Sequence, residues 1–269
     1  MIEVPHGQLN VVADGPDDGR PVVLIHAGIA DLRAWDDVVP FLTTAGFRSV
    51  RFDMRGYGRS RTEDVEFYPA DDVVAVMDHY GVDQAAIVGN SFGGMIAFDT
   101  ALAHPGRVSA LVSVAGGIAG FWEEPPAEER ALVERMDSLE EDPAADIEEI
   151  VRLDLDFWVE GPGQTPGRAD PKVRSAVEEM DRNHWTAGKP HGQPRFRDRE
   201  ASKHVAGLRI PVLAVAGSLD ASGAVRPVQF LQENAQNAKA VVIPGVAHMI
   251  GMEVPEQLAK LITEFLLDV

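Results

Sequence analysis

Ser91, Asp220 and His248 have the residue types and the chain order needed for nucleophilic catalysis. A serine hydroxyl is a weak nucleophile at neutral pH. It attacks a carbonyl carbon when a histidine takes its proton and an acid holds that histidine in place. Ser91 stands in a Gly-x-Ser-x-Gly pattern that runs from Gly89 to Gly93, and the other two residues follow apolar segments further along the chain. These three residues therefore indicate covalent acyl transfer.

The segments on either side of Ser91 predict how it is held. Residues 84–89 form an apolar run of strand length, and apolar side chains recur with helical spacing from Phe92 to His104. A tight turn between the two needs glycines, because Cβ atoms would collide with neighbouring chain. Such a turn raises the serine hydroxyl above the sheet edge and leaves the Phe92 N–H unpaired at the helix start. The competing interpretation is an ordinary turn with a solvated serine.

Strands and helices alternate through residues 8–115, which predicts right-handed crossovers and a parallel sheet. The predicted strands are 8–13, 21–26, 48–52, 84–89 and 108–114, and the predicted helices are 35–44, 70–80 and 92–104. The alternation resumes with strands 210–217 and 240–243 and helices 225–234 and 255–267. Asp220 and His248 follow these later strands. We therefore expect both residues at the same edge of the sheet as Ser91.

Residues 117–205 interrupt the alternation. They contain helical patterns over 127–139, 145–158 and 172–185 and no convincing strand. We expect a core domain of residues 1–116 and 206–269, with residues 117–205 forming a helical cap over the Ser91 edge. The Gly- and Pro-rich joints at Gly161-Pro162-Gly163 and Gly188-Lys189-Pro190 predict rigid-body motion of this cap. A fixed helical decoration beside the sheet is the alternative.

Composition narrows the classes of function. A chain of 269 residues suits one large α/β domain with or without an insertion. The net charge of −19 would repel nucleic-acid phosphates. No apolar run approaches the roughly 20 residues of a membrane span, and no signal-peptide pattern opens the chain, so we expect a cytoplasmic protein. Because the chain has no cysteine, no ligand-spaced histidines and no dinucleotide fingerprint, we expect neither metal nor cofactor. A homodimer is compatible with the sequence.

Five motifs occur in the order found in one large family. They are His26-Ala27-Gly28, Asp53-x-Arg55-Gly56-x-Gly58-x-Ser60, Gly89-x-Ser91-x-Gly93, Gly217-x-x-Asp220 and Gly245-x-x-His248. In these motifs the sequence resembles a serine hydrolase of the α/β-hydrolase fold with a helical cap, in the lactonase, carboxylesterase and cofactor-free haloperoxidase branch. The resemblance implies a mostly parallel sheet flanked by helices.

The resemblance also implies roles for individual residues. Ser91 would be the nucleophile, His248 the base and Asp220 the orienting acid. The oxyanion hole would combine the Phe92 N–H with that of Gly28. Because the family's usual His-Gly-x is His-Ala-Gly here, Ile29 is an alternative second donor. Dehalogenases and soluble epoxide hydrolases carry an aspartate nucleophile, so the serine argues against both.

Several other residues need an interpretation. Ile29, Trp122, Trp158, Trp185 and Met249 are the candidates for lining a substrate pocket, although packing within the cap explains the tryptophans equally well. We expect His26 to brace its loop, Asp53 to be structural rather than a rival triad acid, and Asp99 to be solvated.

The leading hypothesis for the function is hydrolysis of a small-molecule carboxylic ester or lactone. Hydrolysis of 3-oxoadipate enol-lactone, C–C bond hydrolysis and perhydrolysis remain alternatives on the same triad, as does a ligand receptor that hardly turns over. The loops and the cap set the substrate, not the fold.

Overall fold

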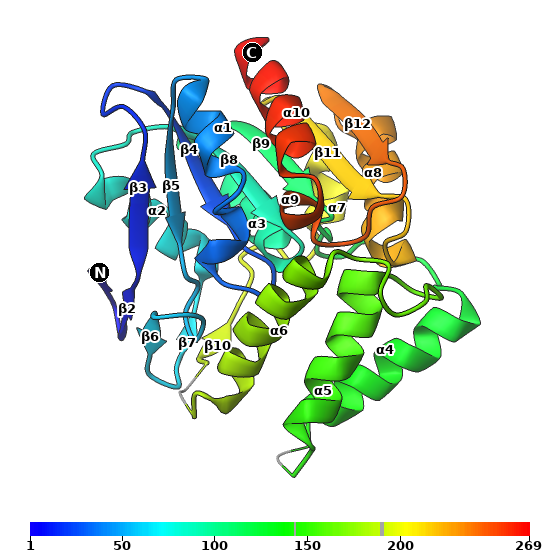
Figure 1. Cartoon of the computed structure of the whole chain (residues 1–269). Coiled ribbons are helices and arrows are strands. Elements are labelled where there is room, and N and C mark those ends of the chain that lie inside the picture. The colour runs from blue at the N-terminus through cyan, green and yellow to red at the C-terminus, as the bar shows by residue number, and fades with distance from the viewer. Residues whose placement is uncertain (143, 189–190) are drawn as a thin grey trace.

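A computed structural model of the chain describes residues 1–142, 144–188 and 191–269 (Figure 1). The described strands are β1 Ile2–Val4, β2 Gly7–Leu9, β3 Val11–Asp14, β4 Arg20–Ile25, β5 Phe47–Phe52, β6 Arg61–Thr62, β7 Glu66–Phe67, β8 Ala85–Asn90, β9 Val108–Val114, β10 Gln193–Pro194, β11 Val212–Gly217 and β12 Ala238–Ile243. The described helices are α1 Val39–Thr44, α2 Pro69–His79, α3 Phe92–Ala103, α4 Ala127–Glu140, α5 Ile147–Asp154, α6 Pro171–Thr186, α7 Ala201–His204, α8 Ser222–Asn234, α9 Ile250–Glu253 and α10 Pro255–Leu267. Short 3₁₀ turns are η1 Leu32–Trp35 and η3 Val205–Gly207, and η2 Leu155–Glu160 is π-helical.

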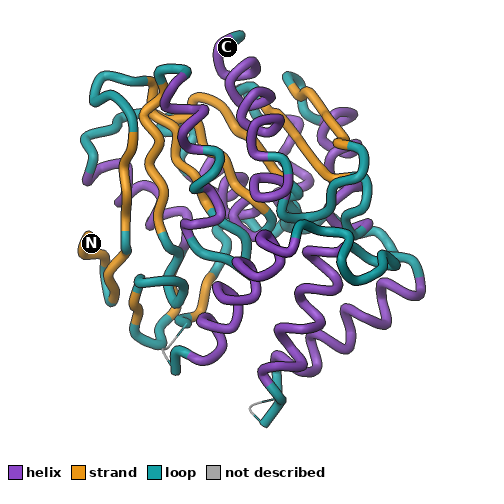
Figure 2. Tube along the Cα trace, viewed as in Figure 1, coloured by secondary structure: helices purple, strands orange, loops and turns teal. Residues whose placement is uncertain are grey.

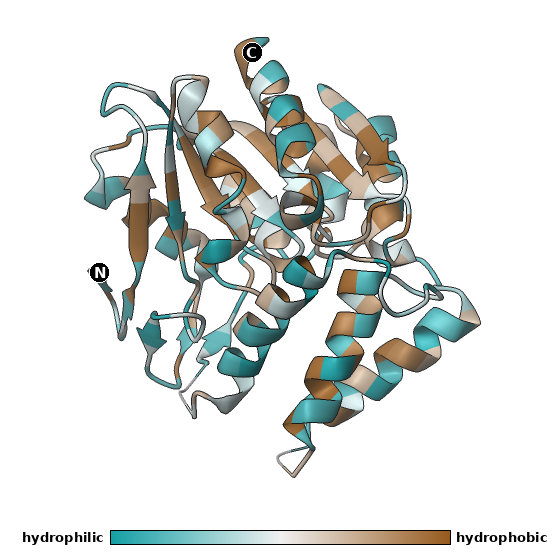
Figure 3. Cartoon of the chain, in the orientation of Figure 1, coloured by the Kyte–Doolittle hydropathy of each residue, from teal (hydrophilic) through white to brown (hydrophobic). Residues whose placement is uncertain are grey.

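The central sheet has seven strands in the order β12-β11-β9-β8-β4-β5-β3. All neighbouring strands are parallel except β3, which pairs with β5 in the antiparallel sense. The central strands β8 and β11 are buried along their whole length, as expected for strands covered on both faces. In Figure 3 the middle of the sheet is correspondingly brown. The predicted α/β-hydrolase arrangement is therefore confirmed.

Helices cover both faces of this sheet. Apolar side chains of α1 and α10 pack on one face, and those of α2, α3 and most of α8 pack on the other. Figure 2 shows the strands lying between these two helical layers. Since all the parallel strands end at one edge, the loops after β4, β8, β11 and β12 gather there. The sheet thus brings the segments that carry Gly28, Ser91, Asp220 and His248 to one place.

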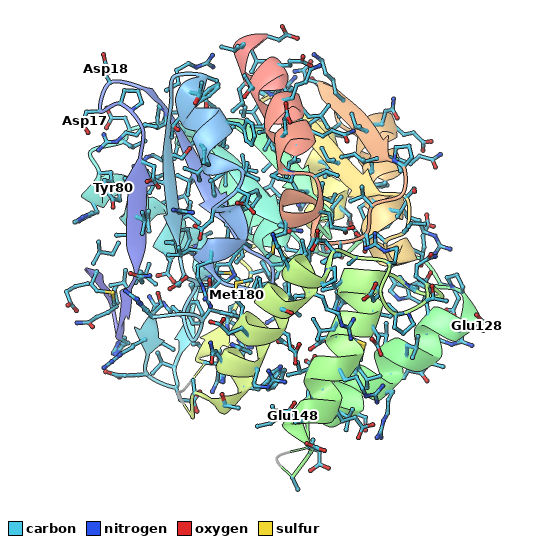
Figure 4. All side chains as sticks on the ribbon, viewed as in Figure 1. Asp17, Asp18, Tyr80, Glu128, Glu148 and Met180 are labelled. Carbon is cyan, nitrogen blue, oxygen red and sulfur yellow. The ribbon has the colours of Figure 1, made fainter. Side chains whose placement is uncertain are left out.

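Helices α4, α5 and α6 lie together beyond this edge of the sheet (Figure 1). A small apolar cluster joins α5, η2 and α6 to the loops at the strand ends: Val151, Leu155 and Val177 pack with Ala27 and Met249. In Figure 4 the exposed side chains of Glu128 and Glu148 mark the outer surface of this helical group.

Ion pairs also connect the helical group to the core. The Arg168 guanidinium donates to the Glu253 carboxylate of α9 at 2.6 Å, and both side chains are largely buried. Arg33 of η1 donates to Glu179 of α6 at 2.8 Å. A rigid-body motion of the whole group would have to break both pairs.

The structure differs from the sequence expectations in several segments. Residues 117–205 were expected to lack strands, yet Gln193–Pro194 pairs in parallel with Glu66–Phe67. A two-residue strand is too short to show a period-two pattern. The predicted helix 145–158 becomes α5 followed by the π-helical η2. The predicted strand 8–13 is divided into β2 and β3. Of the Gly188-Lys189-Pro190 joint, Lys189 and Pro190 lie outside the described residues.

Candidate active site

Ser91 sits in a strained turn between β8 and α3. Its backbone angles, φ 57° and ψ −116°, lie in a region that residues with side chains rarely adopt. The chain packs so closely here that a Cβ on Gly89 would lie 2.0 Å from the Gly93 carbonyl oxygen. A Cβ on Gly93 would lie 2.4 Å from the Ile25 carbonyl oxygen. The Ser91 N–H donates to the Val114 carbonyl at 2.9 Å, which fixes the turn against β9.

His248 and Asp220 form a buried pair. The imidazole Nδ1 lies 3.0 Å from Asp220 Oδ1 and 2.9 Å from Oδ2. Their side chains are 3% and 0% exposed. The Ala221 N–H donates to Asp220 Oδ1 at 2.7 Å, which holds the carboxylate in place. A carboxylate beside Nδ1 favours a proton on that nitrogen and leaves Nε2 free to accept one.

Trp158 of η2 packs directly on this histidine. The ring centroids of Trp158 and His248 are 4.5 Å apart at 42°. The His248 N–H donates to the Trp158 carbonyl at 3.3 Å. The wider π-helical turn is the segment that brings this indole over the imidazole, and such turns are frequent at functional sites. A side chain from the insertion thus covers the predicted base.

A cavity of about 270 Å³ lies between the strand-end loops and the helical group of α4, α5 and α6. We call it the Ser91 cavity. Its lining includes Ser91, Phe92, His248, Gly28 and Ile29 from the core, with Tyr57 on one wall. Glu140, Asp154, Trp158, Asp181, His184 and Trp185 line it from the other side. The structure therefore brings the predicted nucleophile, the predicted base and both oxyanion-hole loops to one cavity. Trp158 and Trp185, two of the predicted pocket residues, line the same cavity.

Two of the predicted pocket residues lie elsewhere. The Trp122 side chain is 73% exposed and does not line the Ser91 cavity, because it precedes α4 on the outer side of the insertion. Met249 is 1% exposed and packs with Leu155 and Val159 of η2. Its place in this apolar contact explains why it is absent from the cavity wall. Both expectations are corrected.

Three carboxylates form one wall of the Ser91 cavity, which we call the acidic wall: Glu140 of α4, Asp154 of α5 and Asp181 of α6. Burial, together with the charges of Asp181 and Glu140, raises the pKa of Asp154 to about 9. Burial also raises the pKa of Asp181 to about 7. The sequence interpretation missed this wall. The sequence does contain a pattern that indicates inward-facing acids: Asp154 and Asp181 each lie at helical spacing from an apolar residue, Val151 and Val177 respectively.

A second, apolar cavity of about 200 Å³ adjoins the first. The two share Tyr57, Phe92, His184 and Trp185 as lining residues. Other walls of this apolar cavity come from Phe52, Met54, Phe67, Pro69 and Ile96. Burial, with the nearby His191, lowers the pKa of His184 to about 3, so its imidazole is neutral at the boundary between the cavities. An apolar chain placed here would adjoin the Ser91 cavity.

Asp53 and His26 each make hydrogen bonds that hold neighbouring loops. Asp53 accepts hydrogen bonds from the Leu32 N–H at 2.9 Å and the Arg59 N–H at 2.8 Å. His26 Nε2 accepts from the Met54 N–H at 2.9 Å and so braces its loop.

Asp99 was expected to be solvated, but it is 2% exposed. Its carboxylate accepts from the N–H groups of Arg197 and Asp198, at 3.1 Å and 2.9 Å. The expectation was wrong because the segment around Arg197 and Asp198 covers Asp99 of α3, a contact distant in sequence.

Within the described ranges, no group of three or more His, Cys, Asp or Glu side chains is arranged to hold a metal ion. Nor does any described helix combine the length and apolar character needed to cross a bilayer.

Comparison with known proteins shows to which family the chain belongs. It is 38% identical to epoxide hydrolase B of Mycobacterium tuberculosis over 120 residues, which are 42% of this chain and 34% of that protein. It is 26% identical to a pimeloyl-[acyl-carrier protein] methyl ester esterase of Yersinia enterocolitica over 260 residues, 95% of each chain. Among solved structures, an N-acyl homoserine lactone degrading enzyme superposes with a TM-score of 0.75 at 27% identity, over 98% of this chain and 99% of that one. Residues 20–255 match the family described as alpha/beta hydrolase fold, so the chain belongs to the α/β hydrolases.

Proposed function

We propose that the protein hydrolyses a carboxylic ester or lactone through a covalent acyl-enzyme, with Ser91 as nucleophile. One observation carries the proposal: the strained turn presents Ser91 to a cavity that also holds His248, and His248 is paired with a buried carboxylate. A strained backbone at such a position is typical of a nucleophile elbow. The whole-length likeness to a methyl ester esterase and to a lactone-degrading enzyme is consistent with this chemistry.

The first half of the reaction acylates Ser91. His248 Nε2 takes the hydroxyl proton while Oγ forms a bond to the carbonyl carbon. Phe92 begins α3, so its N–H has no partner one helical turn earlier and can donate to the oxyanion. Gly28 or Ile29 supplies the second N–H from the loop after β4. The intermediate then collapses, the C–O bond breaks, and His248 gives its proton to the leaving alcohol.

The second half returns the enzyme to its starting state. Water gives a proton to His248 and attacks the acyl carbon, and the Ser91–acyl bond breaks with the proton returning to Oγ. Throughout both halves Asp220 keeps the proton-bearing Nδ1 pointed toward itself and stabilises the imidazolium. For a lactone the leaving alcohol stays attached to the acyl group until water releases the open hydroxy acid.

The likeness to an epoxide hydrolase does not favour epoxide opening here. An aspartate that attacks an epoxide forms an ester, and water can cleave that ester at its carbonyl. A serine that attacks an epoxide would form an ether, which has no carbonyl for water to attack. Ser91 therefore suits carboxylic substrates, whose acyl-enzyme is itself hydrolysable.

The two cavities suit parts of a substrate that differ in polarity. We propose that the scissile carbonyl lies in the Ser91 cavity and that an apolar part of the substrate enters the apolar cavity past Trp185. The helices of residues 117–205 would then act as a cap that sets substrate choice. Trp185 would contact both the scissile end and the apolar part of the substrate.

Turnover of p-nitrophenyl esters of increasing acyl length tests the proposal. Wild type should release p-nitrophenol, and the Ser91→Ala variant should lose nearly all of this rate. A Ser91→Ala variant that retains the wild-type rate would contradict the proposed nucleophile. Undetectable turnover by wild type, for a panel that also includes lactones and an enol-lactone, would favour the ligand-receptor alternative. Peroxide-dependent acyl transfer in the same panel would reveal perhydrolysis.

A further inference from the structure

We infer that the acidic wall is a binding subsite for an organic cation, so that the substrate cleaved at Ser91 carries an ammonium group. The inference rests on the proposed function and specifies its substrate class. It starts from the position of the wall: Glu140, Asp154 and Asp181 come from three different cap helices, and all three line the cavity that holds Ser91 and His248. A ligand in this cavity therefore contacts the triad at one end and carboxylates at the other.

Asp181 lacks the partners that a buried carboxylate needs. The residue is 1% exposed, and neither of its carboxylate oxygens has a hydrogen-bond partner among the residues that the structure describes. Asp154 and Trp185 lie close enough to affect its pKa, but neither meets the geometry of a hydrogen bond to it. Arg182, whose charge acts on Asp181, donates to the carboxylates of Glu148 and Glu178. Since an unpaired buried charge is costly, the wall is completed by a proton or by a bound cation.

The rest of the cavity is suited to an ammonium group. Tyr57, Trp158 and Trp185 supply aromatic rings, which attract cations through their faces. Among the described lining residues the basic side chains are His184 and His248. Burial keeps the pKa of His184 near 3, so it carries no competing charge at neutral pH. Within the described part of the chain the Trp185 Nε1–H has no hydrogen-bond partner, so it is available to an acceptor on a ligand.

An inorganic cation is a poorer match for the same wall. A metal ion binds through a closely spaced set of oxygen ligands, whereas the described acidic side chains form no such group. An ammonium bound partly by aromatic faces does not need that close spacing. It would lie between the carboxylates and the indoles, with its N–H groups or its methyl groups directed at Asp181.

Two matched pairs of esters test the inference on wild-type protein. Dimethylaminoethyl butyrate and isoamyl butyrate have the same shape and differ by a cationic nitrogen in the alcohol part at pH 7. Ethyl 4-(dimethylamino)butyrate and ethyl 5-methylhexanoate make the same comparison in the acyl part. At least one amino ester should have a kcat/KM about tenfold or more above its neutral partner, as expected for one charge-assisted contact.

Variants of the acidic wall test whether it causes the preference for the amino ester. Asp181→Asn, alone and with Asp154→Asn, should bring the ratio of kcat/KM within the favoured pair toward one. Glu141→Gln removes one charge at the end of the same α4 helix that carries Glu140, but Glu141 is exposed and does not line the cavity. This control should keep both the ratio and the basal rate. A ratio that persists in Asp181→Asn with Asp154→Asn would overturn the inference.

Failure of the inference is distinguishable from failure of the proposed function. If all four esters are cleaved with ratios near one, the acidic wall is a protonated structural pair and the inference is overturned while the hydrolase proposal stands. If none is cleaved, binding to the Ser91→Ala protein by calorimetry decides. An amino ester that binds about tenfold tighter than its partner supports the subsite, and any smaller difference, including no binding, overturns it.

Discussion

Replacing Asp220 and Asp53 by asparagine, one at a time, separates the triad acid from its rival. Both carboxylates are buried and both accept several hydrogen bonds, so the two substitutions are matched in chemistry. In Asp220→Asn the Ala221 N–H still needs the oxygen at the Oδ1 position. The amide nitrogen must then take the Oδ2 position, 2.9 Å from His248 Nδ1.

The consequence is a change of tautomer. An NH₂ group beside Nδ1 makes that nitrogen an acceptor and moves the ring proton to Nε2, where it blocks proton transfer from Ser91. We expect kcat to fall by about 10⁴, as in other triads that lose tautomer control. The melting temperature should change little by comparison, because the new amide can still bond both neighbours.

Asp53→Asn should show the opposite profile. Asp53 Oδ1 accepts from the Leu32 N–H, and Oδ2 accepts from Arg59 N–H and Asn10 Nδ2. An asparagine loses at least one of these charge-assisted bonds, worth about 1.5–3 kcal/mol. For a domain of this size that corresponds to a fall in melting temperature of roughly 3–12 °C.

Steady-state kinetics and thermal melts of both variants, at a temperature where each is folded, provide the measurement. The kcat of folded Asp53→Asn should stay within about tenfold of wild type, against the loss of about 10⁴ expected for Asp220→Asn. If Asp53→Asn lowers kcat more than Asp220→Asn does, Asp220 is not the triad acid.

Three further predictions concern the cap, the acidic wall and metals. Trp185→Ala should change the ratio of kcat/KM between long and short acyl esters, because the indole borders both cavities, whereas the exposed Trp122→Ala should leave it unchanged. A uniform loss across all esters in Trp185→Ala, tracking a lower melting temperature, would show a purely packing role. Burial raises the pKa of Asp154 to about 9 and of Asp181 to about 7, so the unliganded fold binds protons that the unfolded chain releases above about pH 4. Its free energy of unfolding should therefore fall as pH rises from about 4 to 9. The fall should be less steep in the double variant Asp154→Asn with Asp181→Asn. If the melting temperatures of wild type and double variant fall equally with pH, the raised pKa values of these two carboxyls are contradicted. Dialysis against EDTA should leave esterase activity intact, and a loss that one added metal restores would refute metal-independent chemistry.

The sequence predicts the core of the site because its signals are local. Ser91 lies between a strand pattern and a helix pattern, and the glycines around it report the close backbone approach that the structure shows. Asp220 and His248 follow apolar strands, and parallel strands end at one edge. Strand periodicity and chain order were therefore enough to bring these segments together.

The arrangement of residues 117–205 could not be predicted in this way, because their contacts with the rest of the chain are distant in sequence. Asp154 and Asp181 look like ordinary helix acids until α5 and α6 pack against each other over the cavity. Trp122 and Trp158 are both aromatic residues of the insertion, yet one is exposed and the other lies on His248. Asp99 is covered by a returning segment that no local pattern connects to α3.

Covalent labelling of Ser91 tests the central claim most directly. A fluorophosphonate probe reacts with a serine that has been activated by its base and held beside an oxyanion hole. We expect one labelled peptide in wild type, containing Ser91 by mass spectrometry, and no labelling of Ser91→Ala. Labelling that persists at equal intensity in Ser91→Ala, or a wild-type protein that the probe leaves unmodified, would contradict the proposed nucleophile.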